Sequence, residues 1–205
     1  GNIIAAAQEE RFTRRKHDPG YPEKAIAFCL RQAGITIDQV DHVVFYEKPL
    51  IKFERLLLTA FSTFPRSMKV FREAMLTWMQ KKLWVRSLIL EKLGIPGRKL
   101  LFADHPVSHA AAGFYCSPFE EAAVLTLDGA GEWTTATMGV GRGTKLEVLK
   151  EMRFPHSVGL LYSAFTAYCG FEVNEGEYKL MGLAPYGEPK YVDRIMKMIR
   201  INDDG

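Results

Sequence analysis

The chain has 205 residues, 47% of them hydrophobic and 25% charged, with a formal net charge of +3. This is an ordinary globular composition, which excludes a disordered chain, and the small charge alone implies no partner. The cysteines form no CxxC pair and no disulfide framework, which favours a reducing, cytoplasmic location, and no apolar run is long enough to span a bilayer. Because the sequence starts without methionine and stops at "INDDG", we expect a piece of a longer protein.

The first fifty residues predict a strand, a helix and a second strand. The stretch "NIIAAAQEERFTRRKHD" begins as a short apolar strand and ends in a polar, basic turn. After Pro22, "EKAIAFCLRQAG" predicts a helix because its apolar residues recur at helical spacing, and Gly34 can close it. A buried strand over Val43–Tyr46 follows. This order points to an α/β fold.

Residues 51–100 form a basic segment with a helical pattern. They hold eleven Lys or Arg and three Asp or Glu, a net charge of +8, whereas the rest of the chain holds 16 basic and 21 acidic residues, a net charge of −5. From Met68 to Leu93 one predicted helix face carries Phe71, Met75, Trp78, Val85 and Ile89. The segment is either a basic surface for nucleic acid or anionic lipid, or a helical insertion over residues 51–94. We favour the insertion, with its apolar face packed on the domain or on a second subunit.

The second half predicts a strand that leads into a helix, then three antiparallel strands, then further helices. "RKLLFADHP" is the strand and helix start, and residues 120–154 predict a meander with turns at "DGAGE" and "GRGTK". Helices are predicted at "SVGLLYSAFTAYCG", which Gly170 stops, and at "YVDRIMKMIR". Between them, "EVNEGEYKLMGLAPYGEP" predicts a polar loop.

His105 and His109 are a candidate metal-binding pair. Asp104 can cap a helix whose first position is Pro106, which places the two imidazoles one turn apart on the same face. One ion would need a further ligand, and a carboxylate with two imidazoles suits iron, manganese or zinc. The alternative is two surface or capping histidines. Pro106 stands where zinc proteases carry their general-base glutamate, so this is not that motif.

Three other stretches are candidate ligand-binding segments. Asp128 follows an apolar strand and precedes two glycines, which let backbone N–H groups approach an anion, although a plain hairpin turn has the same pattern. "NEGEYKLMGLAPYG" is either a ligand loop, in which Lys179 offers a point charge, or a surface connection. The basic residues of "EERFTRRKHD" either meet an anionic substrate at the end of a strand or form a solvated charge run, which is the stronger reading.

Taken together and in this order, these stretches resemble one family. The phrases that carry the resemblance are "AAAQEERFTRRKHD", "VVFYEKP", "HPVSHAAAGFYCSPFEEAAVLTLDGAGEW" and "NEGEYKLMGLAPYG". They resemble the amino-terminal part of O-carbamoyltransferases of the nodulation-protein and cephalosporin-carbamoylation type, whose first domain is similar to the actin, Hsp70 and sugar-kinase fold. The resemblance implies that residues 1–119 are most of a first lobe without its initial hairpin, and that residues 120–205 begin a second lobe.

The resemblance also implies site residues and cofactors. His105, His109 and Asp128 match the family's metal ligands, with iron as the expected ion and manganese, zinc or magnesium as alternatives. No residue is assigned a catalytic role. The residues that match segments lining the nucleotide and carbamoyl region are Lys16, Gly129, Gly131, Glu132, Glu177, Lys179 and Gly182.

The implied reaction uses ATP and carbamoyl phosphate to form carbamoyl-adenylate, and the carbamoyl group then moves to a hydroxyl of a small-molecule acceptor. A cation beside a phosphate-facing turn would bind and polarise such an anionic adenylate. The implied partner is a YrdC-like domain of the same longer chain, which in relatives makes the adenylate, so the piece alone is expected to be inactive; a homodimer is a further expectation. The rivals are a metal-dependent hydrolase with the same three ligands and a non-enzymatic membrane- or nucleic-acid-binding module acting through residues 51–100.

Overall fold

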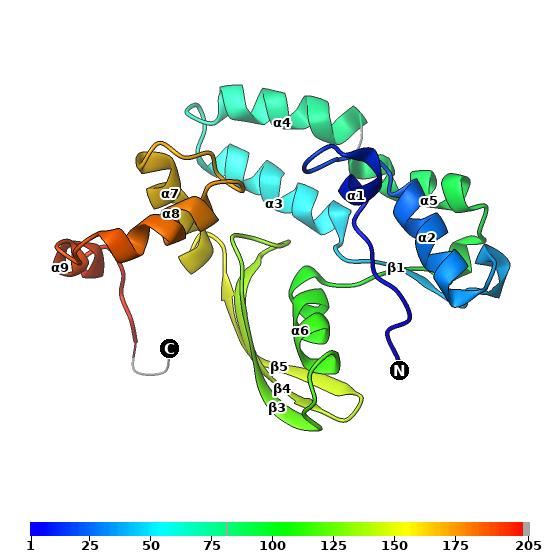
Figure 1. The fold of residues 1–205 in the computed structure, drawn as a ribbon. Coiled ribbons are helices and arrows are strands. Elements are labelled where there is room, and N and C mark those ends of the chain that lie inside the picture. The colour runs from blue at the N-terminus through cyan, green and yellow to red at the C-terminus, as the bar shows by residue number, and fades with distance from the viewer. Residues whose placement is uncertain (81, 203–205) are drawn as a thin grey trace. The chain divides into compact units, whose positions relative to one another are not determined.

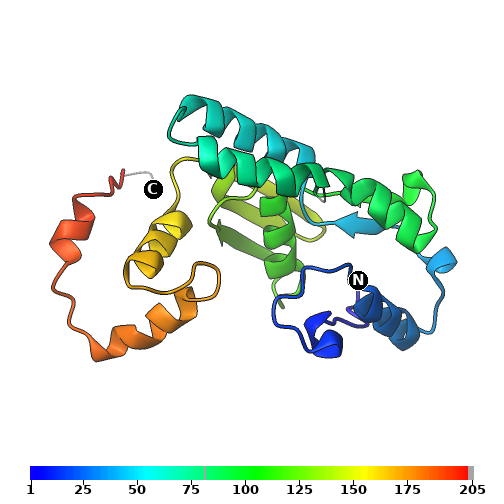
Figure 2. The ribbon, with the colours of Figure 1, turned by 90° about the horizontal axis from the view of Figure 1, so that it is seen from above.

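The computed structural model describes residues 1–80 and 82–202 and is drawn in two views in Figures 1 and 2. The chain forms two compact units, Gly1–His109 and Ala110–Gly205. Each unit combines helices with a small sheet, which confirms the expected α/β class. The predicted lobes, residues 1–119 and 120–205, stay a prediction. Among the described helices, none combines the length and the apolar character that crossing a membrane requires.

The first unit is built on a two-stranded parallel sheet. In it β1 (Val43–Phe45) pairs with β2 (Leu100–Phe102), with Val43 opposite Leu100 and Phe45 opposite Phe102. The buried core beside this sheet consists of Ile89, Ile95 and Leu100. The helical elements of this unit are α1 (Glu10–Thr13), α2 (Glu23–Ala33), η1 (Ile37–Gln39), α3 (Pro49–Ser62), α4 (Met68–Gln80), η2 (Lys82–Trp84), α5 (Val85–Leu93), η3 (Gly97–Lys99) and the start of α6 (His105–Tyr115).

The helix predicted after Pro22 is confirmed as α2. It ends at Gly34, which adopts a left-handed conformation with φ of 66° and donates its N–H to the carbonyls of the last turn. At its first turn, the carboxylate of Glu9 accepts hydrogen bonds from the N–H groups of Lys24 and Ala25 at 3.3 and 2.8 Å. Glu9 therefore caps this helix from a distant part of the chain, in the role that a local Ser or Asp usually fills.

The strand expected at the start of the chain is wrong. Residues 1–8 have no regular secondary structure, and none of the described strands pairs with them. Ile3 and Ile4 are 71% and 65% exposed. A strand exists only where a neighbour takes up its backbone hydrogen bonds, so an apolar stretch without such a neighbour stays irregular.

The basic segment is helical, as predicted, but it is interrupted. Helices α3 and α4 lie side by side in Figures 1 and 2, and the ring of Phe53 contacts that of Trp78 at a centroid distance of 5.6 Å. The single helical run predicted from Met68 to Leu93 is wrong, because α4 ends at Gln80 and α5 starts at Val85. Trp84 Nε1 donates to the carbonyl of Met79 at 2.7 Å, and so occupies an acceptor that a continuing helix would use for its own N–H.

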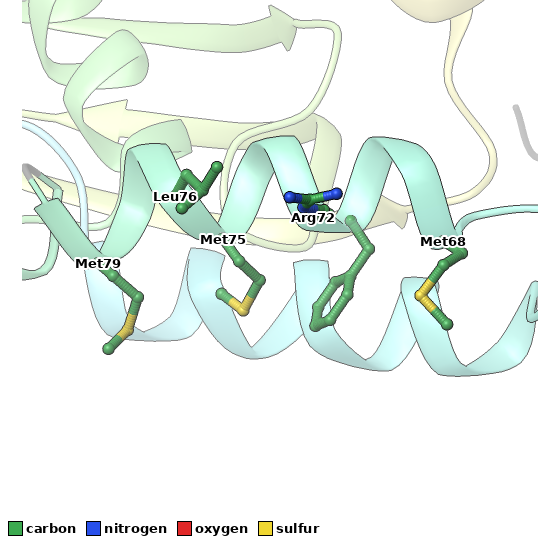
Figure 3. A pocket seen from close by; sticks show the side chains of 6 residues that line it. Met68, Arg72, Met75, Leu76 and Met79 are labelled. Atoms are coloured by element: carbon green, nitrogen blue, oxygen red, sulfur yellow. The ribbon is translucent and has the colours of Figure 1, made fainter.

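Part of the apolar face of α4 lies on the surface. Trp78 packs against α3 and is 5% exposed, whereas Leu76 and Met79 are each 56% exposed. The five residues of the predicted face, Phe71, Met75, Trp78, Val85 and Ile89, are buried or half-buried, and Leu76 and Met79 lie outside that face. Figure 3 shows the groove left there, which has a volume of about 500 Å³ and is lined by Met68, Phe71, Arg72, Met75, Leu76 and Met79.

The second unit contains the predicted three-stranded antiparallel meander. Strand β4 lies between β3 and β5, and Glu121 to Leu127 pair with Arg142 to Ala136 in register. The predicted turn at "GRGTK" is confirmed, and Gly143 takes a φ of 56° there. The elements of this unit after α6 are β3 (Glu121–Leu127), β4 (Thr134–Arg142), β5 (Lys145–Arg153), α7 (Val158–Tyr168), α8 (Glu177–Leu183), η4 (Ala184–Tyr186) and α9 (Val192–Met196).

The last turns of α6 pack on the sheet of this second unit. The ring of Phe114, which is 3% exposed, fills the space that a Cβ atom at Gly141 would need. The hydroxyl of Tyr115 donates to the carbonyl of Thr144 at 2.9 Å. A side chain at position 141 would push α6 off the sheet, so this glycine serves close packing and not a turn.

Candidate functional site

The histidine pair lies on the first turn and a half of α6, directly after β2. The N–H of Ser108 donates to the carbonyl of Asp104 at 2.9 Å, so Asp104 occupies the N-cap position, as predicted. The helix starts at His105, one residue before the predicted first position, Pro106. The carboxylate of Asp104 lies 2.7 Å from the ammonium group of Lys48.

The two imidazoles meet on one face of the helix, as their spacing predicted. Nε2 of His105 lies 3.1 Å from Nε2 of His109, and the rings meet edge to face with centroids 4.7 Å apart. Either ring can donate this hydrogen bond, depending on its tautomer. The same separation suits a shared ion: two bonds of about 2.0–2.1 Å to one ion would enclose an angle of about 95–100°, between the octahedral and tetrahedral ideals. The pair therefore fits a metal ion.

A buried carboxylate stands beside this pair and was missed by sequence reasoning. Glu47 is 7% exposed, its Oε2 lies 2.7 Å from Lys52 Nζ, and the same oxygen lies 3.9 Å from Nδ1 of His105. The signal for it was present in the sequence. Glu47 follows β1 and His105 follows β2, and in a parallel sheet the carboxyl ends of neighbouring strands meet at the same edge.

Asp128 ends β3 and opens the connection to β4. Its N–H donates to the carbonyl of Thr135 at 2.9 Å, and its Oδ1 accepts the N–H of Gly129 at 2.7 Å. The N–H of Gly131 donates to the carbonyl of Thr134 at 3.1 Å. Both glycine N–H groups thus make hydrogen bonds within the turn. Glu132, which follows, is buried, with 6% exposed.

The start of α7 holds the Asp128 turn in place. Ser157 is the N-cap residue: its Oγ accepts the N–H of Leu160 at 3.0 Å and donates to the carbonyl of Gly129 at 2.6 Å. Gly159 packs so closely on the Asp128–Gly129 peptide that a Cβ atom there would collide with the Asp128 carbonyl. The sequence signal for this contact was a serine followed two residues later by a glycine at a predicted helix start.

The polar loop predicted before the last helix is wrong in part, because Glu177, Lys179 and Gly182 lie in helix α8. The Oε1 atom of Glu177 accepts the N–H of Asn174 at 3.1 Å and the hydroxyl of Ser163 at 2.8 Å. These hydrogen bonds, first the one from Asn174, lower the pKa of Glu177 below its usual value. Its carboxylate therefore ties α8 to the preceding turn and to α7.

The two other predicted positions in this region face open surroundings. The Nζ atom of Lys179, on an exposed side chain, lies 5.9 Å from the centre of the Tyr178 ring. A Cβ atom at Gly182 would meet no atom within 4 Å, so nothing in the fold requires glycine there. A requirement for glycine at this position would have to come from a ligand.

Lys16 lies in the exposed turn after α1. The turn is held by Glu10, whose Oε2 accepts the N–H of His17 at 2.9 Å. The acidic residues of "EERFTRRKHD" therefore form structural contacts, Glu9 at α2 and Glu10 at this turn, while the basic side chains Arg14, Arg15 and Lys16 are exposed. The exposed basic side chains agree with the reading of these residues as a solvated charge run.

The comparison with known families settles the relationship of the chain. Residues 1–203 match the family described as "Carbamoyltransferase N-terminus". The chain belongs to this family. The resemblance noted from the sequence phrases is therefore confirmed, and it extends over nearly the whole chain.

Several curated relatives are similar to this chain. "Uncharacterized protein sll1178" from Synechocystis is 54% identical over 213 residues, which cover 100% of this chain and 35% of the relative. "Nodulation protein NolNO" from Sinorhizobium fredii is 34% identical over 92% of this chain and 27% of its own length. "Nodulation protein NolO" from Bradyrhizobium diazoefficiens is 36% identical over 50% of this chain and 19% of its own length. The chain spans about a third or less of the length of these relatives.

Proposed function

We propose that the chain is the amino-terminal part of an ATP-dependent O-carbamoyltransferase. The observation that carries this proposal is the family match over residues 1–203, and the similarity to two proteins named for nodulation supports it. In the proposed reaction, water cleaves carbamoyl phosphate to carbamate and phosphate, and a carbamate oxygen then attacks the α-phosphorus of ATP to give carbamoyl-adenylate and pyrophosphate. A hydroxyl oxygen of a small molecule, such as a sugar, a nodulation factor or an antibiotic-like compound, then attacks the carbamoyl carbon and AMP leaves.

His105, His109 and Asp128 are the proposed metal ligands, because each offers one atom that an ion can bind. Two neutral imidazoles and one carboxylate suit Fe²⁺ best in this proposal, with Mn²⁺, Zn²⁺ and Mg²⁺ as alternatives. A bound ion would supply positive charge to an anionic adenylate. The chain's own part is to present two Nε2 atoms from one helix turn and a carboxylate whose backbone is fixed by the start of α7.

The nucleotide region is proposed to lie along the Asp128 turn and α8. From the resemblance, we assign the anion contacts in this region to the ammonium groups of Lys16 and Lys179. These two side chains are exposed and carry charge of the required sign. In this proposal two further predicted positions, Glu132 and Gly182, shape the region without contacting a phosphate.

We further propose that both units are parts of an actin- and Hsp70-like fold. In the second unit, the order of three antiparallel strands followed by α7 supports this proposal. In the first unit it is supported by two parallel strands joined through helices. The cytoplasmic location is proposed from the cysteine pattern, and the YrdC-like domain of the longer chain and a homodimer are proposed from the resemblance.

The test compares metal content and ATP binding in the full-length protein and in two histidine variants. His109→Ala should lower metal content well below that of the wild type and weaken ATP binding, because one of two neighbouring imidazole ligands is lost. His42→Ala, which removes an exposed histidine of the same unit, should change neither quantity. Unchanged metal content in His109→Ala would overturn the ligand assignment. Pyrophosphate release from ATP that does not depend on carbamoyl phosphate would overturn the reaction.

A further inference from the structure

Glu47 stands at the carboxyl end of β1, directly beside the first histidine of α6. Its side chain is buried, and its Oε2 lies 3.9 Å from Nδ1 of His105, while the other ring nitrogen, Nε2, lies 3.1 Å from His109. The two nitrogens of His105 thus have different neighbours: a carboxylate on one side and the second imidazole on the other.

The backbone just before Glu47 is held to the segment that carries His105. The N–H of Ala103 donates to the carbonyl of Phe45 at 2.9 Å, and the hydroxyl of Ser108 donates to the carbonyl of Tyr46 at 2.9 Å. Two side-chain contacts add to these, the ion pair of Lys48 with Asp104 at 2.7 Å and the ring of Tyr46 on that of His105 at 5.7 Å. The approach of Glu47 to His105 is therefore set by the fold.

A buried carboxylate costs free energy unless an opposite charge lies beside it. Lys52 supplies the charge, at 2.7 Å from Oε2, and is itself largely buried, with a side-chain exposure of 21%. An ion pair of this kind contributes little to stability beyond what an apolar pair of the same size would give, so stability does not explain why it is here. The position of Glu47 next to His105, a candidate metal ligand, offers an explanation.

We propose that Glu47 is a positioning residue for the metal centre. Its negative charge favours the tautomer of His105 that carries the proton on Nδ1, which leaves the lone pair of Nε2 for the ion. At 3.9 Å the contact is electrostatic, and a shift of about 1 Å makes it an N–H···O hydrogen bond. Lys52 holds the carboxylate in place. The inference rests on the proposed function, because it takes His105 as a ligand.

The test measures binding of Co²⁺, a probe with visible absorption, to variants of the full-length protein in competition with a chelator. Glu47→Gln keeps the shape of the side chain and removes its charge, and the dissociation constant for Co²⁺ should rise about 10- to 100-fold. Glu54→Gln is the matched control, because it makes the same exchange at an exposed glutamate of the same unit. Its dissociation constant should stay close to that of the wild type.

A double variant separates positioning from folding. Glu47→Gln leaves Lys52 without its partner charge, so the single variant also loses stability. Glu47→Gln combined with Lys52→Met removes both charges; it should restore the unfolding temperature but leave Co²⁺ binding weak. Recovery of wild-type Co²⁺ affinity in the double variant would overturn the proposal. Failure of the metal site itself is distinguishable, because His109→Ala would then bind Co²⁺ as tightly as the wild type.

Discussion

Replacing Ser157 with alanine removes two hydrogen bonds at once from the start of α7. The hydroxyl caps the helix through the N–H of Leu160 and donates to the carbonyl of Gly129, next to Asp128. Loss of a serine N-cap costs about 0.5–2 kcal/mol, and loss of the second hydrogen bond about 0.5–1.5 kcal/mol. We therefore expect the free energy of local opening of α7 to fall by about 1–3 kcal/mol.

Amide hydrogen exchange in the full-length protein measures this change directly. Because a tenfold change in an opening equilibrium is about 1.4 kcal/mol, residues 158–168 should exchange about 5- to 150-fold faster in Ser157→Ala. Ser157→Thr keeps the hydroxyl and should exchange nearly as the wild type does. If exchange of α7 in Ser157→Ala stays within twofold of the wild type, the contact with the Asp128 turn does not hold this helix, and the reasoning is refuted.

Gly159, which packs on the Asp128 turn, and Gly182, a predicted site residue, should respond to alanine in opposite directions. Gly159→Ala forces a Cβ atom into the Asp128 carbonyl and should cost about 1–3 kcal/mol in thermal unfolding, whereas Gly182→Ala meets open space inside α8 and should add about 0.5–1 kcal/mol. If Gly182 also shapes the nucleotide region, its alanine variant should bind ATP more weakly despite the gain; equal ATP affinity would remove it from the site. The lowered pKa of Glu177 means that its carboxylate stabilises the fold above about pH 4.5, the unfolded-state value, and that this contribution is lost as the pH falls through the folded-state pKa. Protection of residues 172–177 from proteolysis should accordingly fall with acid in the wild type and respond less to acid in Glu177→Gln; the same acid response in both proteins would contradict this assignment.

Local patterns predicted those elements whose ends and faces are encoded nearby. Gly34 after an amphipathic run predicted α2, and the turn sequences "DGAGE" and "GRGTK" predicted β3, β4 and β5. The histidine pair belongs with them, because a spacing of four places two side chains on one helix face whatever surrounds them. In each case the deciding interaction lies within a few residues along the chain.

The predictions that failed depended on contacts that neither the spacing of apolar residues nor the turn residues reveal. None of the described strands pairs with residues 1–8, where a strand was expected. Helix α4 ends near Trp84, whose Nε1 donates a hydrogen bond to the carbonyl of Met79 in its last turn. Helix α8 was taken for a loop because its glycines suggested flexibility, whereas the carboxylate of Glu177 anchors its first turn through Asn174 and Ser163. Glu47 was missed because only the parallel pairing of β1 with β2 brings it to His105.

The rate at which the methionines of the α4 groove are oxidised can measure how accessible the groove is to solvent. Met68 and Met79 are 51% and 56% exposed, while Met75 lies deeper in the same groove. Thioether sulfur is oxidised to the sulfoxide at a rate that follows its exposure. With mild peroxide and mass spectrometry, Met68 and Met79 should therefore react before Met75 wherever this face meets solvent. Protection of all three in a longer or assembled form would report, without labels or mutations, that the groove is covered there.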